Sequence, residues 1–257
     1  MNDLPLASFQ GSLSTAAVIM QAAGRSVAVA VVVVGVLAAT TTAHVMGLGS
    51  CRKFDGMKDF DPARFTGTWY VLNKLGTRSD CLSVTYNLTE DGQGFRVKEV
   101  RRPPYSDIIP LDLVVTNVGS LKSHGAASEF IATWENSFLP DMKSDYRVID
   151  TDYDNYAIDY ECHQVAFIKR RSATILSRQK ELNPELIMQL KETLITKFDV
   201  PGERLNTIDQ STCIDTEAND FNVVIDEKGL SSAYQEMDRL AKLPYEKAAK
   251  EIAKKKE

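Results

Sequence analysis

Short runs in which apolar and polar residues alternate make up the middle of this 257-residue chain. Alternation with a period of two is typical of β-strands that have one buried face. Turn-forming residues such as Glu90-Asp91-Gly92 and Pro103-Pro104 separate these runs. The pattern predicts eight strands, at residues 69–75, 81–88, 95–101, 111–118, 129–135, 146–150, 156–164 and 169–177. Eight strands predict an all-β fold in which a closed barrel can enclose one small ligand.

One amphipathic helix is predicted after the last strand. Asn183 is a suitable N-cap, Pro184 fits the first helical position, and Glu185 lies at the positive end of the helix dipole. The segment Val200-Pro201-Gly202 ends the helix. Its apolar residues recur every three or four positions, at Leu186, Ile187, Leu190, Leu194 and Phe198. We therefore expect this helix to pack with one face against the outside of the barrel.

The first 50 residues have the features of a signal peptide and leader. An unbroken apolar stretch at 27–39 follows Arg25 and precedes the small residues 41–43, as in a secretory signal. The stretch is too short to span a bilayer. Because the segment before it is long for a signal, Met20 is a candidate for the true start. The sequence predicts a secreted, extracellular protein, and an uncleaved anchor is the alternative.

Composition and charge narrow the function further. The hydrophobic content of 44% is enough for a core, and the net charge of -5 argues against a nucleic-acid-binding surface. Residues 215–257 carry nearly balanced charge around Pro244, which predicts a charged, partly helical or disordered extension without stable membrane insertion. The predicted barrel domain is therefore 51–214.

The four cysteines all follow the apolar stretch. In an oxidising compartment an even number of cysteines indicates disulfides, and four allow three pairings. No Cys-x-x-Cys spacing or Cys/His cluster is present, so no metal site is expected. These cysteines are Cys51, Cys81, Cys162 and Cys213.

Three short motifs give the chain a family resemblance. The segments 65–70 (Phe-Thr-Gly-Thr-Trp-Tyr), 151–157 (Thr-Asp-Tyr-Asp-Asn-Tyr-Ala) and 176–178 (Leu-Ser-Arg) resemble the three motifs of the lipocalins. Over 51–213 the chain is similar to the branch that holds apolipoprotein D, Lazarillo, bilin-binding proteins and crustacyanins. The resemblance implies an eight-stranded antiparallel up-and-down barrel with one C-terminal helix outside it. It also implies the disulfides Cys51–Cys162 and Cys81–Cys213.

Three motif residues are expected to be structural rather than ligand contacts. The first and last strands of a barrel must pair, which brings Trp69 and Arg178 together at the closed end. A guanidinium over an indole stabilises by about 0.5 to 2 kcal/mol. Arg178 is also expected to donate hydrogen bonds to backbone carbonyls, and Gly67 belongs to the same barrel floor.

Strand alternation predicts the residues of a ligand site. If Cys162 faces outward, its neighbours face inward, and counting back from Arg178 orients the last strand. Aromatic and apolar residues of the fifth and sixth predicted strands supply the wall. Each of these residues has an ordinary alternative role, as core or as a solvated rim, and a one-residue slip would reverse the faces. The predicted site consists of Phe130, Trp134, Tyr146, Val148, Glu161, His163, Arg170, Ser172 and Thr174.

The favoured function is a non-enzymatic carrier of a small hydrophobic ligand. Candidate ligands are a fatty acid, a sterol, a retinoid or a pigment such as a bilin or carotenoid, and no cofactor is required. The alternatives are an isomerase or redox enzyme on the same barrel and a secreted interaction module. Paired cysteines leave no thiolate nucleophile, which disfavours the redox enzyme. A homodimer or a receptor is a further candidate partner, and Asn87 begins the single glycosylation sequon.

Overall fold

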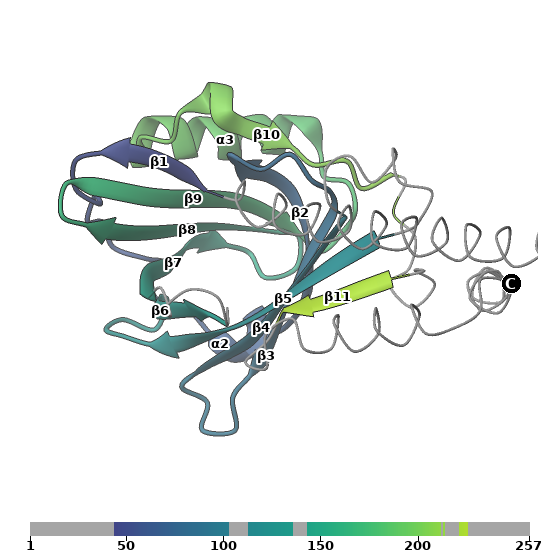
Figure 1. Cartoon of the computed structure of the whole chain (residues 1–257), viewed down its shortest axis with the longest axis horizontal. Helices are drawn as coiled ribbons and strands as arrows, with labels where there is room; N and C mark the ends of the chain where they lie inside the picture. Colours follow the sequence, from purple (N-terminus) through teal and green to yellow (C-terminus); the bar gives the residue numbers. More distant parts are fainter. Residues whose placement is uncertain (1–43, 103–112, 136–142, 212, 214–220, 226–257) are drawn as a thin grey trace, which may run out of the picture.

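Eight antiparallel strands form a closed barrel in the computed structural model (Figure 1). The structure describes residues 44–102, 113–135, 143–211, 213 and 221–225. Each barrel strand pairs with the next, and the last pairs back with the first, which confirms the predicted fold. The strands are β2 (Gly67–Leu75), β3 (Asp80–Leu88), β4 (Gly94–Arg102), β5 (Leu113–Ser123), β6 (Glu129–Trp134), β7 (Lys143–Thr151), β8 (Tyr156–Val165) and β9 (Ile168–Ser177).

The strand β5 is longer than its alternating pattern predicts. It continues five residues past 118, through Gly119 and Ser120, because it pairs with both β4 and β6 there. A Cβ atom on Gly119 would lie 2.8 Å from the ring of Trp134, so the missing side chain lets the two strands approach. Residues 111 and 112 of the predicted strand lie outside the described residues.

The barrel is fully paired only at one end. β2 pairs with β9 from Tyr70 to Lys74, and beyond that point β9 pairs instead with β1 (Val45–Leu48). Likewise β6 pairs with residues 119–123 of β5, while residues 113–117 of β5 pair in parallel with β11 (Phe221–Ile225). The short strand β10 (Leu205–Thr207) extends the sheet beside β2. The barrel therefore has a closed end and an open end.

Two of these added strands come from segments outside the predicted barrel domain. β1 belongs to the predicted leader and β11 to the predicted C-terminal extension. Residues 1–43 of the leader, including Met20 and the apolar stretch 27–39, and residues 215–220 and 226–257 of the extension lie outside the described residues. Signal cleavage and the start at Met20 stay predictions.

The predicted helix is α3 (Pro184–Phe198), and it packs outside the barrel (Figure 1). The side chain of Asn183 accepts a hydrogen bond from the backbone N–H of Glu185, as an N-cap should. Leu190 and Leu194 are buried in a cluster with residues of β8 and β9. The helix ends at Asp199, which has a left-handed backbone with φ of 55°.

Aromatic side chains fill the closed half of the barrel. The short helix α2 (Pro62–Phe65) brings Phe65 to the barrel axis, where its ring centroid lies 5.2 Å from that of Trp69 and 4.9 Å from that of Tyr86. Neighbouring rings continue the contacts at 4.9–6.3 Å. This packed core includes Phe60, Phe65, Trp69, Tyr86, Phe95, Phe130, Tyr146 and Tyr153.

The floor below this core joins the three sequence motifs. The Arg178 guanidinium lies 3.6 Å from the ring centroid of Trp69, and it donates hydrogen bonds to the backbone oxygens of Tyr153, Thr68 and Arg64. Gly67 has φ of +94°, and a Cβ atom there would lie 3.3 Å from an Arg178 nitrogen. The partly buried guanidinium thus has both a π-face and carbonyl acceptors, the arrangement that the motifs predict.

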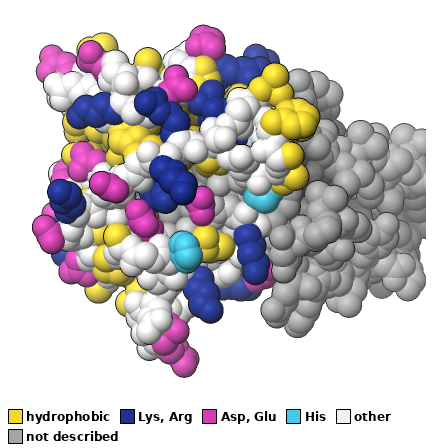
Figure 2. Space-filling view, turned by 90° about the vertical axis from the view of Figure 1, so that its left-hand side faces the viewer, with side chains coloured by type: hydrophobic (Ala, Val, Ile, Leu, Met, Phe, Trp, Pro, Cys, Tyr) yellow, Lys and Arg dark blue, Asp and Glu magenta, His cyan; other side chains and the backbone are white. Residues whose placement is uncertain are grey.

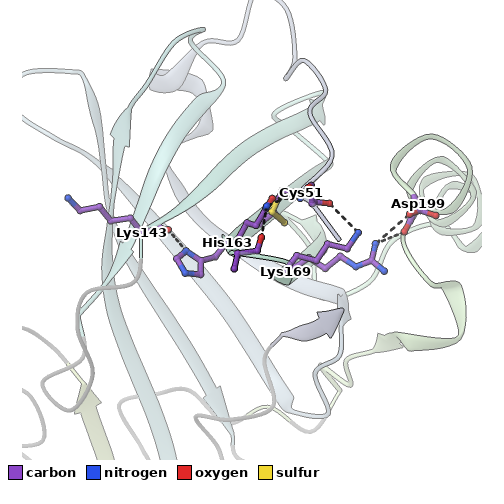
Figure 3. The surroundings of a disulfide bond; sticks show 10 residues. Cys51, Lys143, His163, Lys169 and Asp199 are labelled. Carbon is purple, nitrogen blue, oxygen red and sulfur yellow. Dashed lines mark hydrogen bonds and ion pairs between the residues drawn. A yellow bond between two sulfur atoms is a disulfide. The ribbon is translucent and has the colours of Figure 1, made fainter. Parts of the chain in front are cut away.

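Two disulfides attach chain segments to the barrel wall. Cys51 bonds to Cys162 on β8, and Cys81 on β3 bonds to Cys213, which is the pairing implied by the family resemblance. Next to the first bond, the N–H of Cys51 donates to the side chain of Gln164 (Figure 3).

Among the described residues, no helix is long and apolar enough to cross a bilayer.

Candidate functional site

A small cavity lies between the aromatic core and the open end of the barrel. Its free volume is about 30 Å³, enough for one or two water molecules. Side chains from all eight barrel strands line it, and the lining mixes apolar, aromatic and charged groups. The lining residues are Lys74, Val84, Tyr86, Val97, Glu99, Leu121, Trp134, Tyr146, Asp159, Glu161, Ser172 and Thr174.

A β-bulge places the lysine of this cavity. Strict alternation along β2 from the inward Trp69 would turn Asn73 inward and Lys74 outward. The pairing of β2 with β9 shifts between Val71 and Asn73, so the side chains beyond this point exchange faces. Lys74 therefore points into the barrel, where its ammonium bonds Glu99 Oε2 at 2.5 Å.

Glu99 and Lys74 form a buried ion pair. Burial by itself would raise the pKa of Glu99, but the Lys74 ammonium and the Arg101 guanidinium outweigh it and lower that pKa. Arg101 follows on the same face of β4 and is also buried. Glu99 is therefore ionised and electrostatically compensated.

A chain of hydroxyl groups ends at a second carboxylate. The hydroxyls of Tyr86 and Tyr146 lie 3.0 Å apart, and Tyr146 donates to Asp159 Oδ2 at 3.1 Å. Burial raises the pKa of Asp159 to about 7, although the nearby Lys74 ammonium opposes the shift. Asp159 is thus the titratable group of the cavity near neutral pH.

Glu161 has the opposite electrostatic environment. Burial would raise its pKa, but the His44 imidazole at 3.8 Å and the Arg170 guanidinium at 4.0 Å lower it to about 2. His44 immediately precedes β1, so the pairing of β1 with β9 brings this ring to the mouth of the cavity.

Some polar atoms around the cavity have no hydrogen-bond partner among the residues that the structure describes. They are Trp134 Nε1 and Ser172 Oγ. A buried polar atom without a partner costs about 1–3 kcal/mol. A ligand with a hydroxyl group or another polar group would satisfy such atoms.

The predicted site residues fall into two groups. Lining the cavity are Trp134, Tyr146, Glu161, Ser172 and Thr174. The others do not line it. Phe130 and Val148 belong to the packed core, His163 is half-buried with its ring nitrogen 2.5 Å from the Lys143 carbonyl (Figure 3), and Arg170 lies near the mouth beside Glu161. Whether any of these residues contacts a ligand stays a prediction.

The predicted site omitted four polar residues of the cavity, namely Lys74, Tyr86, Glu99 and Asp159. A signal for Glu99 is present in the sequence, because Phe95, Val97 and Glu99 alternate on one face of β4. A carboxylate that continues an apolar face indicates a buried polar site. No comparable signal exists for Lys74, whose orientation depends on the bulge.

The stability of the protein is expected to depend on pH through Asp159. The pKa of this group is about 7 in the folded protein and about 3.9 in an unfolded chain, so the folded state holds the proton more tightly. Its contribution to stability is complete below about pH 4 and is lost as the pH rises to 7. The variant Asp159→Asn removes this dependence. Relative to the wild type, its free energy of unfolding should rise by up to about 4 kcal/mol between pH 4 and pH 8.

Urea unfolding at a series of pH values measures this difference. The exposed carboxylate Asp145 on β7 provides the control variant Asp145→Asn, which should follow the wild-type pH profile. Parallel profiles for wild type and Asp159→Asn would contradict the raised pKa.

The closed eight-stranded barrel, the external helix, the Trp69–Arg178 floor and the internal cavity together define a lipocalin. A family model described as Triabin matches residues 41–184, more than half of the chain, and the protein belongs to this lipocalin family.

Named relatives agree with this assignment. Apolipoprotein D of Cavia porcellus is 25% identical over 183 residues, which cover 70% of this chain and 92% of the relative. Retinol-binding protein 4 of Gallus gallus is 28% identical over 45% of this chain and 61% of its own length. Among solved structures, lobster apocrustacyanin A1 has a TM-score of 0.55 at 18% identity, covering 68% of this chain and 96% of that one. The last similarity supports the fold alone.

Proposed function

We propose that this protein is a secreted carrier that binds a small, largely apolar molecule inside the barrel. The observation that carries the proposal is a closed lipocalin barrel whose cavity is lined by aromatic and aliphatic side chains together with unpartnered polar atoms. Apolar walls with a few convergent polar groups are the usual chemistry of a ligand site. A relative named for retinol binding supports the same class of ligand.

The charges of the open half favour a neutral ligand. Lys74 is already paired with Glu99, and Arg170 with Glu161, while burial favours the neutral form of Asp159. A ligand carboxylate would add a buried charge without a partner, which is costly, whereas a hydroxyl group needs only a hydrogen bond. We therefore favour a neutral amphiphile, such as a retinoid alcohol or a sterol, over a fatty acid.

The size of the cavity adds a second requirement. Typical small-molecule sites have volumes of about 300–1,000 Å³, far more than the free space here. Binding of such a ligand therefore needs movement of lining side chains at the open end. Trp134 is half-buried and packs against the edge of the core, so we propose that it moves first.

Fluorescence titration with a matched pair of ligands tests this proposal. Retinol is expected to quench the fluorescence of Trp134 and to bind at least about tenfold more tightly than retinoic acid, which has a carboxylate in place of the hydroxyl. The variant Trp134→Phe should lose most of the quenching. Native mass and the absorption spectrum of protein purified from its source then show whether a lipid or a coloured bilin or carotenoid is bound. Failure of all tested ligands, with no extra native mass, would refute the carrier function.

Secretion and glycosylation belong to the same proposal. Asn87 is exposed near the end of β3, so an oligosaccharide can be attached there without displacing core residues. The enzyme alternative receives less support, because one of the relatives is named for retinol binding and all four cysteines are in disulfides. A thiol titration that finds a free cysteine in the folded protein would favour the redox alternative again.

A further inference from the structure

Exposed apolar side chains gather at the open end of the barrel, around the turn between β8 and β9. We call this group the apolar tip; it consists of Met46, Leu48, Val165, Phe167 and Ile168. The exposed fraction is 76% for Leu48 and 69% for Phe167. Strand pairing holds the group together, because Leu48 and Val165 are both register partners of Ile168. The N–H of Gly49 also donates to the Phe167 carbonyl at 2.8 Å.

The turn itself has an unusual composition. Its residues Val165-Ala166-Phe167-Ile168 are all apolar, although turns at a protein surface favour Gly, Asn and Asp. Ala166 has φ of 50°, a left-handed conformation that usually selects glycine or asparagine. Packing of the barrel core does not explain these apolar residues, because the side chains of Val165 and Phe167 are exposed.

Basic residues are close in sequence to the apolar tip. The segments 44–54 and 162–171, which form it, contain five Lys and Arg residues and no Asp or Glu, in a chain whose net charge is -5. These residues are Arg52, Lys53, Lys169, Arg170 and Arg171. Because Arg170 is paired with Glu161 and Arg171 with Asp199, the charge available to a partner comes from Arg52, Lys53 and Lys169. Figure 2 views the molecule from the side on which the β8–β9 turn lies in Figure 1, and both basic and acidic side chains lie beside hydrophobic ones on this face.

The local framework keeps the tip and its basic border in a fixed arrangement. The Cys51–Cys162 disulfide joins the two segments, and the Lys169 ammonium donates to the Ser50 carbonyl at 3.3 Å (Figure 3). Arg171 is held by Asp199 at the end of α3. A preformed surface avoids the entropy cost of ordering flexible loops on binding.

We propose that the apolar tip docks on an anionic phospholipid membrane. Apolar side chains enter the boundary between headgroups and acyl chains, while Lys and Arg side chains attract acidic headgroups. Charge complementarity favours an anionic lipid surface over a neutral one, and each basic residue near the surface strengthens binding about fivefold. Docking by this end brings the mouth of the cavity close to the lipid. The inference does not require that the cavity holds a ligand.

Vesicle sedimentation of the secreted protein, purified from culture medium, tests the proposal. The protein is expected to bind vesicles of phosphatidylcholine with about 30% phosphatidylserine and to bind phosphatidylcholine alone at least about tenfold more weakly. The double variant Leu48→Ser/Phe167→Ser should lose at least about tenfold in affinity. The matched control is Met188→Ser/Ile195→Ser, which removes two exposed apolar side chains of α3 and should bind like the wild type.

A gain of signal provides a second test that does not depend on a loss of binding. In the variant Phe167→Trp, the new indole should shift its emission to the blue when phosphatidylserine vesicles are added. The variant Met188→Trp should show no shift. The charge variant Arg52→Gln/Lys53→Gln should weaken binding and reduce its dependence on salt.

Two results would overturn the proposal. One is equal vesicle binding by the tip variant and the α3 variant. The other is no vesicle binding by the wild type together with a dimer in gel filtration that the tip variant converts to a monomer. The second result would assign the apolar tip to self-association. Neither result bears on retinol binding in the cavity, so the carrier function is judged separately.

Discussion

Replacement of Trp69 by alanine is expected to lower the free energy of unfolding by about 3–5 kcal/mol. The Trp69 side chain is fully buried, and it contacts the ring of Phe65 on one side and the Arg178 guanidinium on the other. Its removal leaves a cavity in the aromatic core and removes the ring that the partly buried Arg178 guanidinium lies over. Urea unfolding followed by far-UV circular dichroism measures the loss.

The second tryptophan is the control for this prediction. Trp134 is half-buried at the edge of the cavity. The variant Trp134→Ala should therefore lower the free energy of unfolding markedly less than Trp69→Ala does. Arg178→Lys should also destabilise, because an ammonium cannot reproduce the three hydrogen bonds of the guanidinium while it lies over the indole. Equal costs for Trp69→Ala and Trp134→Ala would contradict the structural role of the barrel floor.

Loss of the Cys51–Cys162 disulfide is expected to destabilise the protein by a similar amount, about 4–5 kcal/mol. The bond closes a loop with a sequence separation of 111 residues, and its main effect is to restrict the unfolded chain. The variant Cys51→Ala/Cys162→Ala removes the bond without leaving a single thiol. The same unfolding measurement, made without reductant, gives the difference from the wild type.

The second disulfide provides a comparison. Cys81→Ala/Cys213→Ala opens a loop of comparable length, with a separation of 132 residues, and should have a comparable effect on stability. Only the Cys51–Cys162 variant should also weaken vesicle binding, because that bond joins the two segments of the apolar tip. Wild-type stability in both variants would show that the unfolded chain is not restricted by these bonds.

Much of the barrel was predictable because the local sequence patterns agree with the strand pairing that a closed barrel requires. Alternating strands, turn residues between them and the Asn183 cap each indicated the elements that form. The Trp69–Arg178 contact was also predictable, since the first and last strands of a barrel must be neighbours. Alternation along β8 and β9 placed Glu161, Ser172 and Thr174 on the inner face, where the structure also has them.

The ligand-facing surface was harder to predict, because it depends on depth as well as on face. Phe130 and Tyr146 are register partners on neighbouring strands, yet only Tyr146 reaches the cavity, since Phe60 and Phe95 enclose Phe130. Alternation gives the side of the sheet on which a residue lies, but the height of the core is set by the aromatic rings that fill it.

The sequence by itself determined the strands, the external helix, the barrel floor and the family. Each of these follows from local periodicity or from short sequence motifs. Only the tertiary structure decided that a bulge turns Lys74 inward and that β1 and β11 complete the open half of the sheet. These features depend on register between strands far apart in sequence. A one-residue change in register reverses every side chain that follows it, and no local pattern records such a change.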